Sequence, residues 1–483
     1  VTQVPTLPTY AFAALKWGTS LMRLKLCSYQ RFIGIEMRIK MLFSGRDLRK
    51  LIIPLIFEQL LAVSVGLVDV LMVSQSGEAA ISGVALVDNI NRLIIQVMAA
   101  LSTGGAVVCS QFIGKGKKED SRKAGAQLET VLFIFSVIMT LFSITCTRPL
   151  LGIIFGKVED SVMECAVLYF VVTSISYPFL GAYNAGAAIF RSVGNSKISM
   201  EISILMNLIN VGANALFVFV FQWGVFGVAF ATLLSRVTAG IVMTAFVLSH
   251  KNPVKIENIS ELKPIGSIIK KILTIGIPSG IENGMFQVGK LSVTSMVSTF
   301  GTASIAANSV GYTIIDFANI PGSAMGLALI TIVGRCIGAG DKEQAKMYTK
   351  KVIKLAYIGD WACNIVLFLG AGFFANWFNL SLEAHKIAVD ILRAFSITSL
   401  FIWPLSFTLS NSLRAAGDVN FTMTVSIASM WIFRVGSSYL FGVVLGMGVL
   451  GVWIGMFIDW AARSVMFVWR FASGRWLNKK SLA

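Results

Sequence analysis

LIIPLIFEQLLAVSVGLVDVLMVSQSG, from Leu51 to Gly77, is an apolar stretch that nevertheless contains two carboxylates. Its ~25 residues, at ~1.5 Å rise each, form a helix long enough to cross the ~30 Å hydrocarbon core of a bilayer. Glu58 and Asp69 lie on one stripe of that helix because their spacing is close to three helical turns. A carboxylate in a membrane helix is costly unless it faces protein or water, so this stripe predicts a polar interior with a function.

The composition is that of a membrane protein. Of 483 residues, 55% are hydrophobic and 13% are charged, roughly half the charged fraction of a soluble domain. Apolar runs of ~20 residues recur along the chain, whereas a β-barrel would show alternating segments of ~10 residues. We predict an all-α polytopic membrane protein with twelve transmembrane helices, at about 50–75, 81–113, 124–147, 160–190, 196–221, 225–249, 268–298, 303–336, 346–375, 384–414, 418–443 and 448–472.

The two halves of the chain repeat each other at an offset of 224 residues. Proline, glutamate and glycine positions recur at this offset, among them Pro54 and Pro278, Glu58 and Glu282, and Gly114 and Gly338. Such matches across most of a half predict two homologous six-helix bundles. Since each bundle has an even number of helices, the repeats are parallel, and transporters commonly bind substrate between such halves.

The repeat also divides the chain into segments. We predict a basic amino-terminal extension (1–45), an amino-terminal six-helix lobe (46–250), a cytoplasmic linker (251–265), a carboxyl-terminal six-helix lobe (266–475) and a basic cytoplasmic tail (476–483). The extension differs in composition from the rest, and we expect that it is not native and that translation starts near Met37 to Met41.

Basic residues are distributed unequally between the two sets of loops. The opposite side has only Arg148, Lys157 and Lys386, and by the positive-inside rule the richer side is cytoplasmic, with both termini. The richer side carries Lys115, Lys117, Lys118, Arg122, Lys123, Arg191, Lys197, Lys251, Lys255, Lys263, Arg335, Lys342, Lys346, Arg414, Arg475, Lys479 and Lys480. These loops account for the net charge of +17, so we expect no nucleic-acid partner and place the chain in the cell membrane.

The sequence offers little material for catalysis. Its six cysteines are scattered without a CxxC pair, and it has two histidines, which disfavours a metal centre or a Cys–His nucleophile. No Walker A sequence is present, so the chain has no ATP-binding motif of its own. We predict a monomer without enzymatic activity or cofactor, whose partners are the lipid bilayer and small organic substrates.

Four polar residues are predicted to lie at a similar depth in the amino-terminal lobe. Asp69, Asn214 and Thr232 each lie ~9–10 Å from the outer end of their helix, and Asn210 shares a face with Asn214. Their oxygens are ligands that a hard cation such as Na⁺ takes, so we predict a proton or cation site there, with no other metal. The same polar stripe is also typical of hydrogen bonding between membrane helices.

Further charges in apolar segments have two interpretations. Glu58, Glu282 and Lys290 line a central cavity or take part in gating, or they satisfy structural neighbours. Pairs with four-residue spacing are predicted to neutralise each other within a helix, namely Asp88 with Arg92, and Asp459 with Arg463, the second pair joined by Arg434.

Several motifs resemble those of one transporter family. The pattern Pro54…Val68-Asp69-Val70…Gly77 resembles the first helix of multidrug and toxic compound extrusion (MATE) transporters. Gly114-Lys115-Gly116, Arg414-Ala415-Ala416-Gly417-Asp418 and Gly224-Val225-Phe226-Gly227-Val228-Ala229 also agree in order and spacing. The resemblance covers about residues 45–475 and points to a prokaryotic DinF-like or related branch.

The resemblance implies a secondary active antiporter for multidrug efflux. Such a protein exports organic, often cationic amphipathic, compounds in exchange for inward H⁺ or Na⁺ by alternating access. Asp69 matches the family's first-helix carboxylate, Pro54 its first-helix proline at a bend, and Asn210 and Thr232 polar residues of its cation site. Asn214 departs from the family pattern, because related sequences often have Asp there, and this departure favours H⁺.

Two other departures and one alternative accompany this resemblance. Phe286 and Trp403 stand where one subfamily has Glu and Asp. The alternative is a lipid-linked oligosaccharide flippase of the same superfamily, which needs a basic central cavity for a pyrophosphate. Lys290 and Arg434 are the candidates for such a cavity, whereas flippases of this kind usually have fourteen helices.

Overall fold

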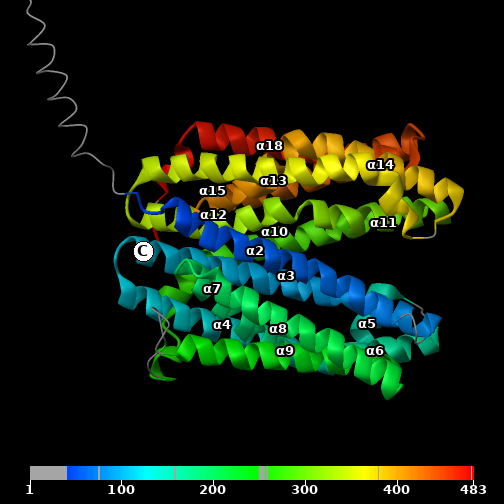
Figure 1. Cartoon of the computed structure of the whole chain (residues 1–483), viewed down its shortest axis with the longest axis horizontal. Helices are drawn as coiled ribbons and strands as arrows, with labels where there is room; N and C mark the ends of the chain where they lie inside the picture. Colours follow the sequence, from blue (N-terminus) through cyan, green and yellow to red (C-terminus); the bar gives the residue numbers. More distant parts are fainter. Residues whose placement is uncertain are drawn as a thin grey trace, which may run out of the picture. The chain divides into compact units, whose positions relative to one another are not determined.

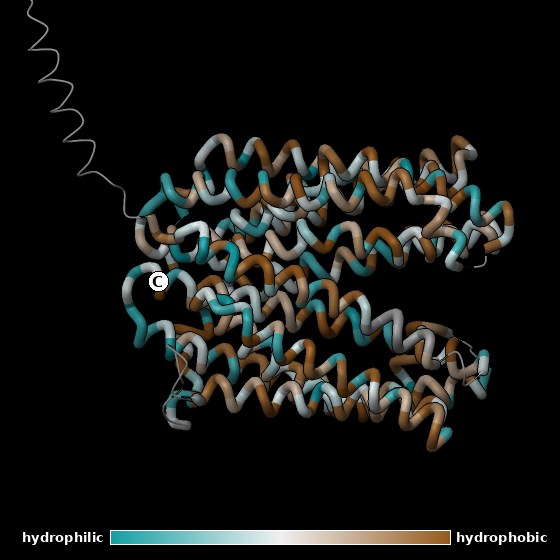
Figure 2. The backbone as a smooth tube through the Cα atoms, in the orientation of Figure 1, coloured by the Kyte–Doolittle hydropathy of each residue, from teal (hydrophilic) through white to brown (hydrophobic). Residues whose placement is uncertain are grey.

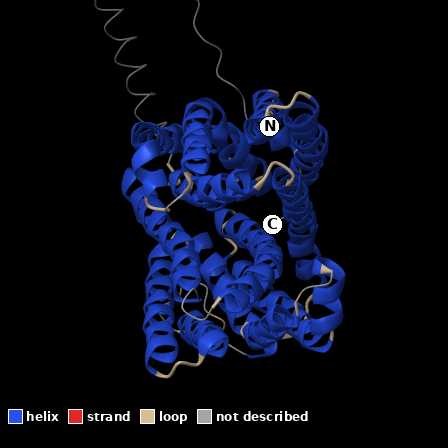
Figure 3. Ribbon diagram, turned by 90° about the vertical axis from the view of Figure 1, so that its right-hand side faces the viewer, coloured by secondary structure: helices blue, strands red, loops and turns tan. Residues whose placement is uncertain are grey.

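The computed structural model describes residues 41–73, 77–156, 159–249, 256, 259–378, 380–479 and 481–482, and within α2 it gives only the backbone of residues 65–71 and 73. Residues 45–483 form one compact unit, which contains all the described helices. Its described residues contain helices and loops and no strand, as Figure 3 shows.

The amino lobe consists of the helices that precede residue 250. They are α2 (Gly45–Val73), α3 (Glu78–Gly114), α4 (Lys118–Thr145), α5 (Thr147–Phe155), α6 (Asp160–Ile175), α7 (Tyr177–Ser192), α8 (Ser196–Asn214), the π-helix η2 (Ala215–Val220) and α9 (Gly224–Leu248).

The carboxyl lobe repeats this order after the short 3-10 helix η3 (Ile259–Leu262). Its helices are α10 (Gly266–Ser298), α11 (Thr302–Ala318), α12 (Ile320–Gly338), α13 (Lys342–Asn376), α14 (Leu382–Trp403), η4 (Pro404–Thr408), α15 (Leu409–Ala415), α16 (Val419–Ser429), η5 (Met430–Val435), α17 (Gly436–Ser438), η6 (Tyr439–Val444) and α18 (Gly448–Ala472), followed by η7 (Arg475–Asn478).

The predicted membrane segments correspond to these helices with two corrections. Segments 160–190 and 303–336 are each two helices, because the chain breaks at Ser176 and at Asn319. Pro178 and Pro321 follow these breaks at the start of α7 and α12, where a missing N–H is tolerated. The first break bends the segment by 46°.

Length and hydropathy agree with a multi-pass membrane protein. Among the described residues, nine helical stretches are long and apolar enough to cross a bilayer, and ten if α6 and α7 form one bent span. α2 and α10 fall outside this set and hold the buried acids Glu58 and Glu282. α2 runs through Pro54 as one helix, so the bend predicted there stays a prediction.

The outer surface of the helices is apolar, as expected of a surface that faces lipid. Large side chains such as Leu369, Ile153 and Leu382 are 77%, 83% and 90% exposed. Figure 2 shows hydrophobic residues along the helices and hydrophilic ones concentrated at the loops of one end. A core cluster in the carboxyl lobe includes Trp403, Trp453 and Trp460.

The two lobes meet through helices near the start of each repeat. α3 packs against α10 and α12 of the other lobe, and α2 packs against α8 of its own lobe and against α12. In Figure 1, α2, α3, α10 and α12 lie in the middle, with α8 and α9 on one side and α13, α14 and α18 on the other. Residues of α3, α10 and α12 that face the other lobe therefore lie between the lobes.

Two glycines bring α3 and α12 into direct backbone contact. A Cβ on Gly114 would overlap the carbonyl oxygen of Arg335, and a Cβ on Gly338 would overlap the carbonyl oxygen of Gln111. Gly114 and Gly338 are counterparts in the repeat, so each lobe contributes the same glycine position to the crossing. Only glycine allows the two helices to approach this closely without displacement.

Hydrogen bonds between the lobes lie beside this crossing. Gln111 Nε2 donates to the carbonyl of Ala415 at 2.9 Å, and Arg335 Nε and Nη2 donate to the carbonyl of Ser192 at 2.9 and 2.7 Å. Gln111 and Arg335 are counterparts in the repeat, as are Ser192 and Ala415 at an offset of 223. We call this end of the bundle, with the loops that follow α3, α7, α12 and α15, the basic end.

The carboxyl-terminal tail docks at the basic end. Trp476 is fully buried and stacks on Phe471 with ring centroids 5.3 Å apart. Ser481 Oγ and the Leu482 N–H lie 3.1 and 2.8 Å from Gln111 Oε1, so the tail contacts the residue that joins the two lobes.

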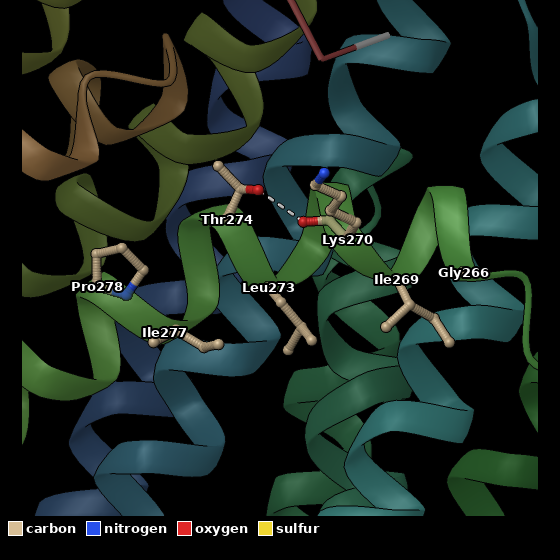
Figure 4. Close-up of a pocket in the computed structure, with 7 residues that line it drawn as sticks. All are labelled: Gly266, Ile269, Lys270, Leu273, Thr274, Ile277 and Pro278. Carbon is tan, nitrogen blue, oxygen red and sulfur yellow. Dashed lines mark hydrogen bonds between the residues drawn. The ribbon is translucent and has the colours of Figure 1, made fainter.

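Shallow grooves flank α10 on its outer side. One of about 610 Å³ lies between α3, α4 and α10 and has an apolar lining that includes Leu101, Phe135 and Ile277. Figure 4 shows another of about 540 Å³ along the first half of α10, where Thr274 donates to the carbonyl of Lys270 at 2.7 Å. Neither groove is lined by a residue predicted to belong to the site.

Candidate functional site

Three of the four polar residues predicted in the amino lobe form a buried chain of hydrogen bonds. Asn214 Nδ2 donates to Asn210 Oδ1 at 3.2 Å, and Asn210 Nδ2 donates to Thr232 Oγ1 at 3.5 Å. Their exposed fractions are 0%, 3% and 4% for Asn214, Asn210 and Thr232. α8 and α9 therefore bring together amide and hydroxyl groups in a part of the lobe that water does not reach.

The backbone changes its helical type directly after this cluster. α8 ends at Asn214 and continues as the π-helix η2, and such segments occur frequently at functional sites. Asn207 shares the sequence stripe but bonds the Ser203 carbonyl of its own helix at 2.6 Å. Asn207 therefore serves its own helix, and it is a natural control for Asn210.

Asp69 lies on α2, but its side chain falls outside the described residues. α2 packs against α8 and α9, so the helix of Asp69 is a neighbour of both helices that carry the cluster. The three helices that carry the four predicted residues thus pack against one another. A contact between the Asp69 carboxylate and the cluster remains a prediction.

Glu58 is a buried acid that is satisfied within the amino lobe. Its Oε1 lies 3.4 Å from Arg191 Nη1 and accepts from the Tyr183 hydroxyl at 3.5 Å. Its Oε2 accepts from Ser199 Oγ at 2.9 Å. These partners come from α7 and α8, so the carboxylate fastens α2 to its own lobe.

Glu282 repeats this arrangement in the carboxyl lobe. Its Oε1 lies 2.6 Å from Arg414 Nη2, and Arg414 Nη1 donates to Asn411 Oδ1 at 3.0 Å. In the described chain, the buried Glu282 Oε2 and Arg414 Nε have no hydrogen-bond partner. The aligned pairs Glu58/Glu282 and Arg191/Arg414 were the sequence signal for both ion pairs, and they favour the structural interpretation of these acids.

The predicted pair of Asp88 and Arg92 is wrong as a direct contact. Among the described residues no ion pair joins them, and Asp88 Oδ1 instead accepts from the Tyr169 hydroxyl at 3.3 Å. Arg92 and Arg236 act on Asp88 at longer range, so its neighbours come from α6 and α9 as well. The four-residue spacing places Asp88 and Arg92 on one face of α3. The Arg92 side chain is exposed, however, and does not form a direct contact with the Asp88 carboxylate.

The predicted pair of Asp459 and Arg463 is present in α18. Arg463 Nε and Nη2 bind the two carboxylate oxygens of Asp459 at 3.0 and 2.9 Å, and Ser429 Oγ donates to Asp459 Oδ1 at 2.5 Å. Arg434 does not join it by a direct contact in the described chain, and it faces the ring of Phe286 at 5.1 Å instead.

Lys290 lies on α10 beside aromatic rings and charges of the carboxyl lobe. Its Nζ is 4.7 Å from the centre of the Tyr312 ring, and the exposed carboxylate of Asp316 is its main electrostatic neighbour. Arg434 and Arg92 also act on it. The structure thus favours a position between the lobes for Lys290, since Arg92 belongs to α3 of the other lobe.

Asp360 is a buried acid that the sequence reasoning missed. It has no exposed surface, and its Oδ1 accepts from the Gly322 N–H at 3.0 Å. Its Oδ2 has no partner in the described chain, and it forms no ion pair there. The available signal was an isolated acid within an apolar helical segment, which was the same signal that singled out Asp69.

Comparison with known proteins agrees with this architecture. A family model described as MatE matches residues 54–216 and again 278–440, two stretches with the 224-residue offset. The chain belongs to the MatE family. As a MatE member it is a multi-pass membrane transporter of the multidrug efflux family and not an enzyme.

Similar MatE proteins cover nearly the whole chain. The uncharacterized transporter YisQ of Bacillus subtilis is 27% identical over 88% of this chain and 94% of its own length. The probable multidrug resistance protein NorM of Thermotoga maritima is 25% identical over 90% and 94%. Each of these alignments spans about nine-tenths of this chain.

Solved structures share the fold. A MOP superfamily transporter from Pyrococcus furiosus, described by the reverse polarity of its binding pocket, superposes with a TM-score of 0.84 at 23% identity over 90% of this chain and 96% of that one. A multidrug resistance MATE transporter in an outward-facing conformation gives a TM-score of 0.83 at 22% identity over 89% and 96%.

Proposed function

We propose that this MatE protein is a secondary active antiporter that exports organic compounds in exchange for inward H⁺ or Na⁺. The observation that carries the proposal is the buried cluster of Asn210, Asn214 and Thr232 on helices adjacent to α2, the helix of Asp69. Short polar side chains on neighbouring helices supply oxygen ligands where a membrane protein otherwise buries apolar groups. The resemblance to MATE transporters predicts cationic amphipathic substrates.

The coupling mechanism follows from the cost of burying a charge. A deprotonated Asp69 is unfavourable in an environment without water, and a bound proton or Na⁺ removes that cost. If the ion binds two arrangements of the amino lobe unequally, it shifts the population between them. Asn214 provides no second carboxylate, so a single acid favours H⁺ over Na⁺ as the coupling ion.

The contacts at the basic end support alternating access. We place this end in the cytoplasm by the distribution of basic loops. The Gly114–Gly338 crossing and the bonds of Gln111 and Arg335 then close the cytoplasmic side between the lobes. Transport requires these contacts to separate, because substrate must enter from the cytoplasm in the opposite state.

Reconstituted transport tests the proposal. Efflux of ethidium or norfloxacin from proteoliposomes is measured under separately imposed H⁺ and Na⁺ gradients, for the native chain and for Asp69→Asn. We expect the variant to lose gradient-driven efflux, and full retention would show that Asp69 is not the coupling residue. Asn210→Ala is expected to weaken coupling, whereas Asn207→Ala serves as the matched control one turn away.

One observation favours the second candidate, a lipid-linked oligosaccharide flippase. That function needs basic residues between the lobes, and Lys290 lies in electrostatic range of Arg434 and Arg92. Competition between a soluble aromatic acid and an anionic phospholipid for this region separates the two functions.

A further inference from the structure

We propose that the carboxyl lobe binds an acidic group between α10, α11, η5 and α18, so that the transported compounds are amphipathic organic anions. This inference rests on the proposed transport function but departs from the cationic substrates that the resemblance predicts. The region between the lobes is positively charged, and amphipathic organic anions are the class of compound that fits this charge.

Charged groups in this region form one connected set with an excess of positive charge. Lys290 interacts with Asp316, Arg434 and Arg92, and Arg434 in turn interacts with Asp459 and Arg463. The set also includes Asp88 and Arg236, which Arg92 links to it, so that it contains the cations Arg92, Arg236, Lys290, Arg434 and Arg463 and the carboxylates Asp88, Asp316 and Asp459. Two positive charges are therefore not balanced by a described carboxylate, in a part of the protein where unbalanced charge is costly.

Arg434 is a buried cation without an ion pair in the described chain. Its side chain is 2% exposed, its Nε has no partner in the described chain, and its only hydrogen bond there is a weak one from Nη1 to Met430 Sδ at 3.9 Å. Asp459, the nearby acid, already binds Arg463 through both oxygens. An incoming anion would supply the partner that the lobe itself does not provide to Arg434.

Aromatic rings complete a surface for the apolar part of such a ligand. Arg434 and Arg463 each lie 5.1 Å from the Phe286 ring, and Phe286 packs edge-to-face on Phe407 with centroids 6.4 Å apart. Lys290 lies over Tyr312 and is partly exposed. An acidic group near Lys290 and Arg434 would leave an aromatic body to pack on these rings.

The repeat shows that Lys290 and Arg434 have no charged counterparts in the amino lobe. At the 224-residue offset Arg434 corresponds to Asn210 of the buried amide cluster, and Lys290 corresponds to Gly66. The same backbone position thus holds a neutral amide in the amino lobe, whose nitrogen donates and whose oxygen accepts, and a guanidinium in the carboxyl lobe. A cation site and an anion site at equivalent places let the coupling ion and an acidic substrate bind without competing for one group.

Equilibrium binding with a matched pair of ligands tests the inference. 2-Naphthoate and 2-naphthylmethylammonium share an aromatic body and differ in charge, and their binding to the purified full chain is measured by tryptophan fluorescence and by calorimetry. We expect naphthoate to bind at least ~10-fold more tightly than the ammonium compound. Tighter binding of the ammonium compound would overturn the proposal.

Variants locate the binding site. Lys290→Gln removes a partly exposed charge and is expected to weaken naphthoate binding about tenfold, with Lys290→Arg restoring it and Lys386→Gln, at the opposite loops, having no effect. Arg434→Gln is expected to weaken naphthoate binding further, and its thermal unfolding is recorded alongside to establish that it folds. Unchanged naphthoate affinity in Lys290→Gln would contradict the assignment.

A competition arm distinguishes the source of the acidic group. Naphthoate binding is repeated in nanodiscs of phosphatidylcholine with and without phosphatidylglycerol. Displacement by phosphatidylglycerol supports the anion site and assigns it to a lipid headgroup, as the flippase alternative requires, whereas undiminished naphthoate binding supports a soluble acid. These measurements need no ion gradient, so a failure of antiport leaves them interpretable, and a failure of anion binding leaves the antiport test intact.

Discussion

The two ion pairs Glu58–Arg191 and Glu282–Arg414 allow a prediction with an internal control. They are counterparts in the repeat, and both are nearly buried, with side-chain exposures between 6% and 16%. Replacing each arginine by glutamine removes the cation and leaves a carboxylate inside the lobe. The two carboxylates then differ in what else they contact.

The geometry gives the expected difference in magnitude. At an effective dielectric constant of about 20, the gross attraction is roughly 6 kcal/mol at 2.6 Å and roughly 5 kcal/mol at 3.4 Å, most of which offsets desolvation. Removing one partner of a buried pair typically costs about 3–5 kcal/mol of unfolding free energy. Without Arg191, Glu58 keeps hydrogen bonds from Ser199 and Tyr183, each worth about 1.5–3 kcal/mol to a charged group, whereas Glu282 keeps none in the described chain. We therefore expect Arg414→Gln to cost about 4 kcal/mol and Arg191→Gln about 2 kcal/mol.

Equilibrium unfolding in mixed micelles measures these costs. The protein is titrated with sodium dodecyl sulfate and followed by tryptophan fluorescence, and double-mutant cycles with Glu58→Gln and Glu282→Gln give the coupling energy of each pair. Equal costs in the two lobes, or a larger cost for Arg191→Gln, would refute the reasoning that the hydroxyl partners compensate Glu58. The double variant Arg191→Gln/Ser199→Ala is expected to lose more unfolding free energy than Arg191→Gln alone. Its loss should therefore be closer to that of Arg414→Gln.

Three other predictions use the same unfolding assay. Asp360→Asn keeps an acceptor for the Gly322 N–H and is expected to change stability by less than about 1 kcal/mol, whereas Asp360→Leu leaves that N–H unpaired and costs about 1–3 kcal/mol. Gly114→Ala is expected to destabilise by about 1–3 kcal/mol through overpacking and to raise cysteine labelling at the basic end, whereas Gly212→Ala, where a Cβ meets nothing, does neither. Trp476→Ala is expected to cost about 3 kcal/mol and to expose the tail to limited proteolysis.

Local pattern predicted the helices and part of the site. The face shared by Asn210 and Asn214 is a property of one helix, so their contact followed from spacing alone. The pair Asp459–Arg463 was predictable for the same reason. Predictions of this kind succeed when both partners lie within about one turn of one helix.

Contacts between helices required the packing. Asp88 was assigned to Arg92 by spacing, but the Tyr169 hydroxyl of another helix reaches it instead. Arg191 lies over a hundred residues from Glu58, so only the repeat gave a hint of that pair. Asp360 was missed because a single acid in an apolar helix has no partner in sequence to draw attention to it.

Helix breaks were a second limit of sequence reasoning. Each of the predicted segments 160–190 and 303–336 is predominantly apolar on both sides of its break, and hydropathy does not distinguish one long helix from two that meet at an angle. Pro178 and Pro321 were the available signals, because a proline in the first turn marks a helix start as readily as a kink.

The crossing of Gly114 and Gly338 has the form of an interface between two identical subunits. In a symmetric dimer of a six-helix chain, this glycine would lie against the carbonyl oxygen of residue 111 in the partner, and residue 111 would donate to the carbonyl of residue 192 in the partner, twice. The present chain retains both bonds although the donors have diverged to Gln111 and Arg335. Because the acceptors are backbone carbonyls, which every residue provides, the two halves could evolve different interiors after gene fusion while the dimer contact persisted.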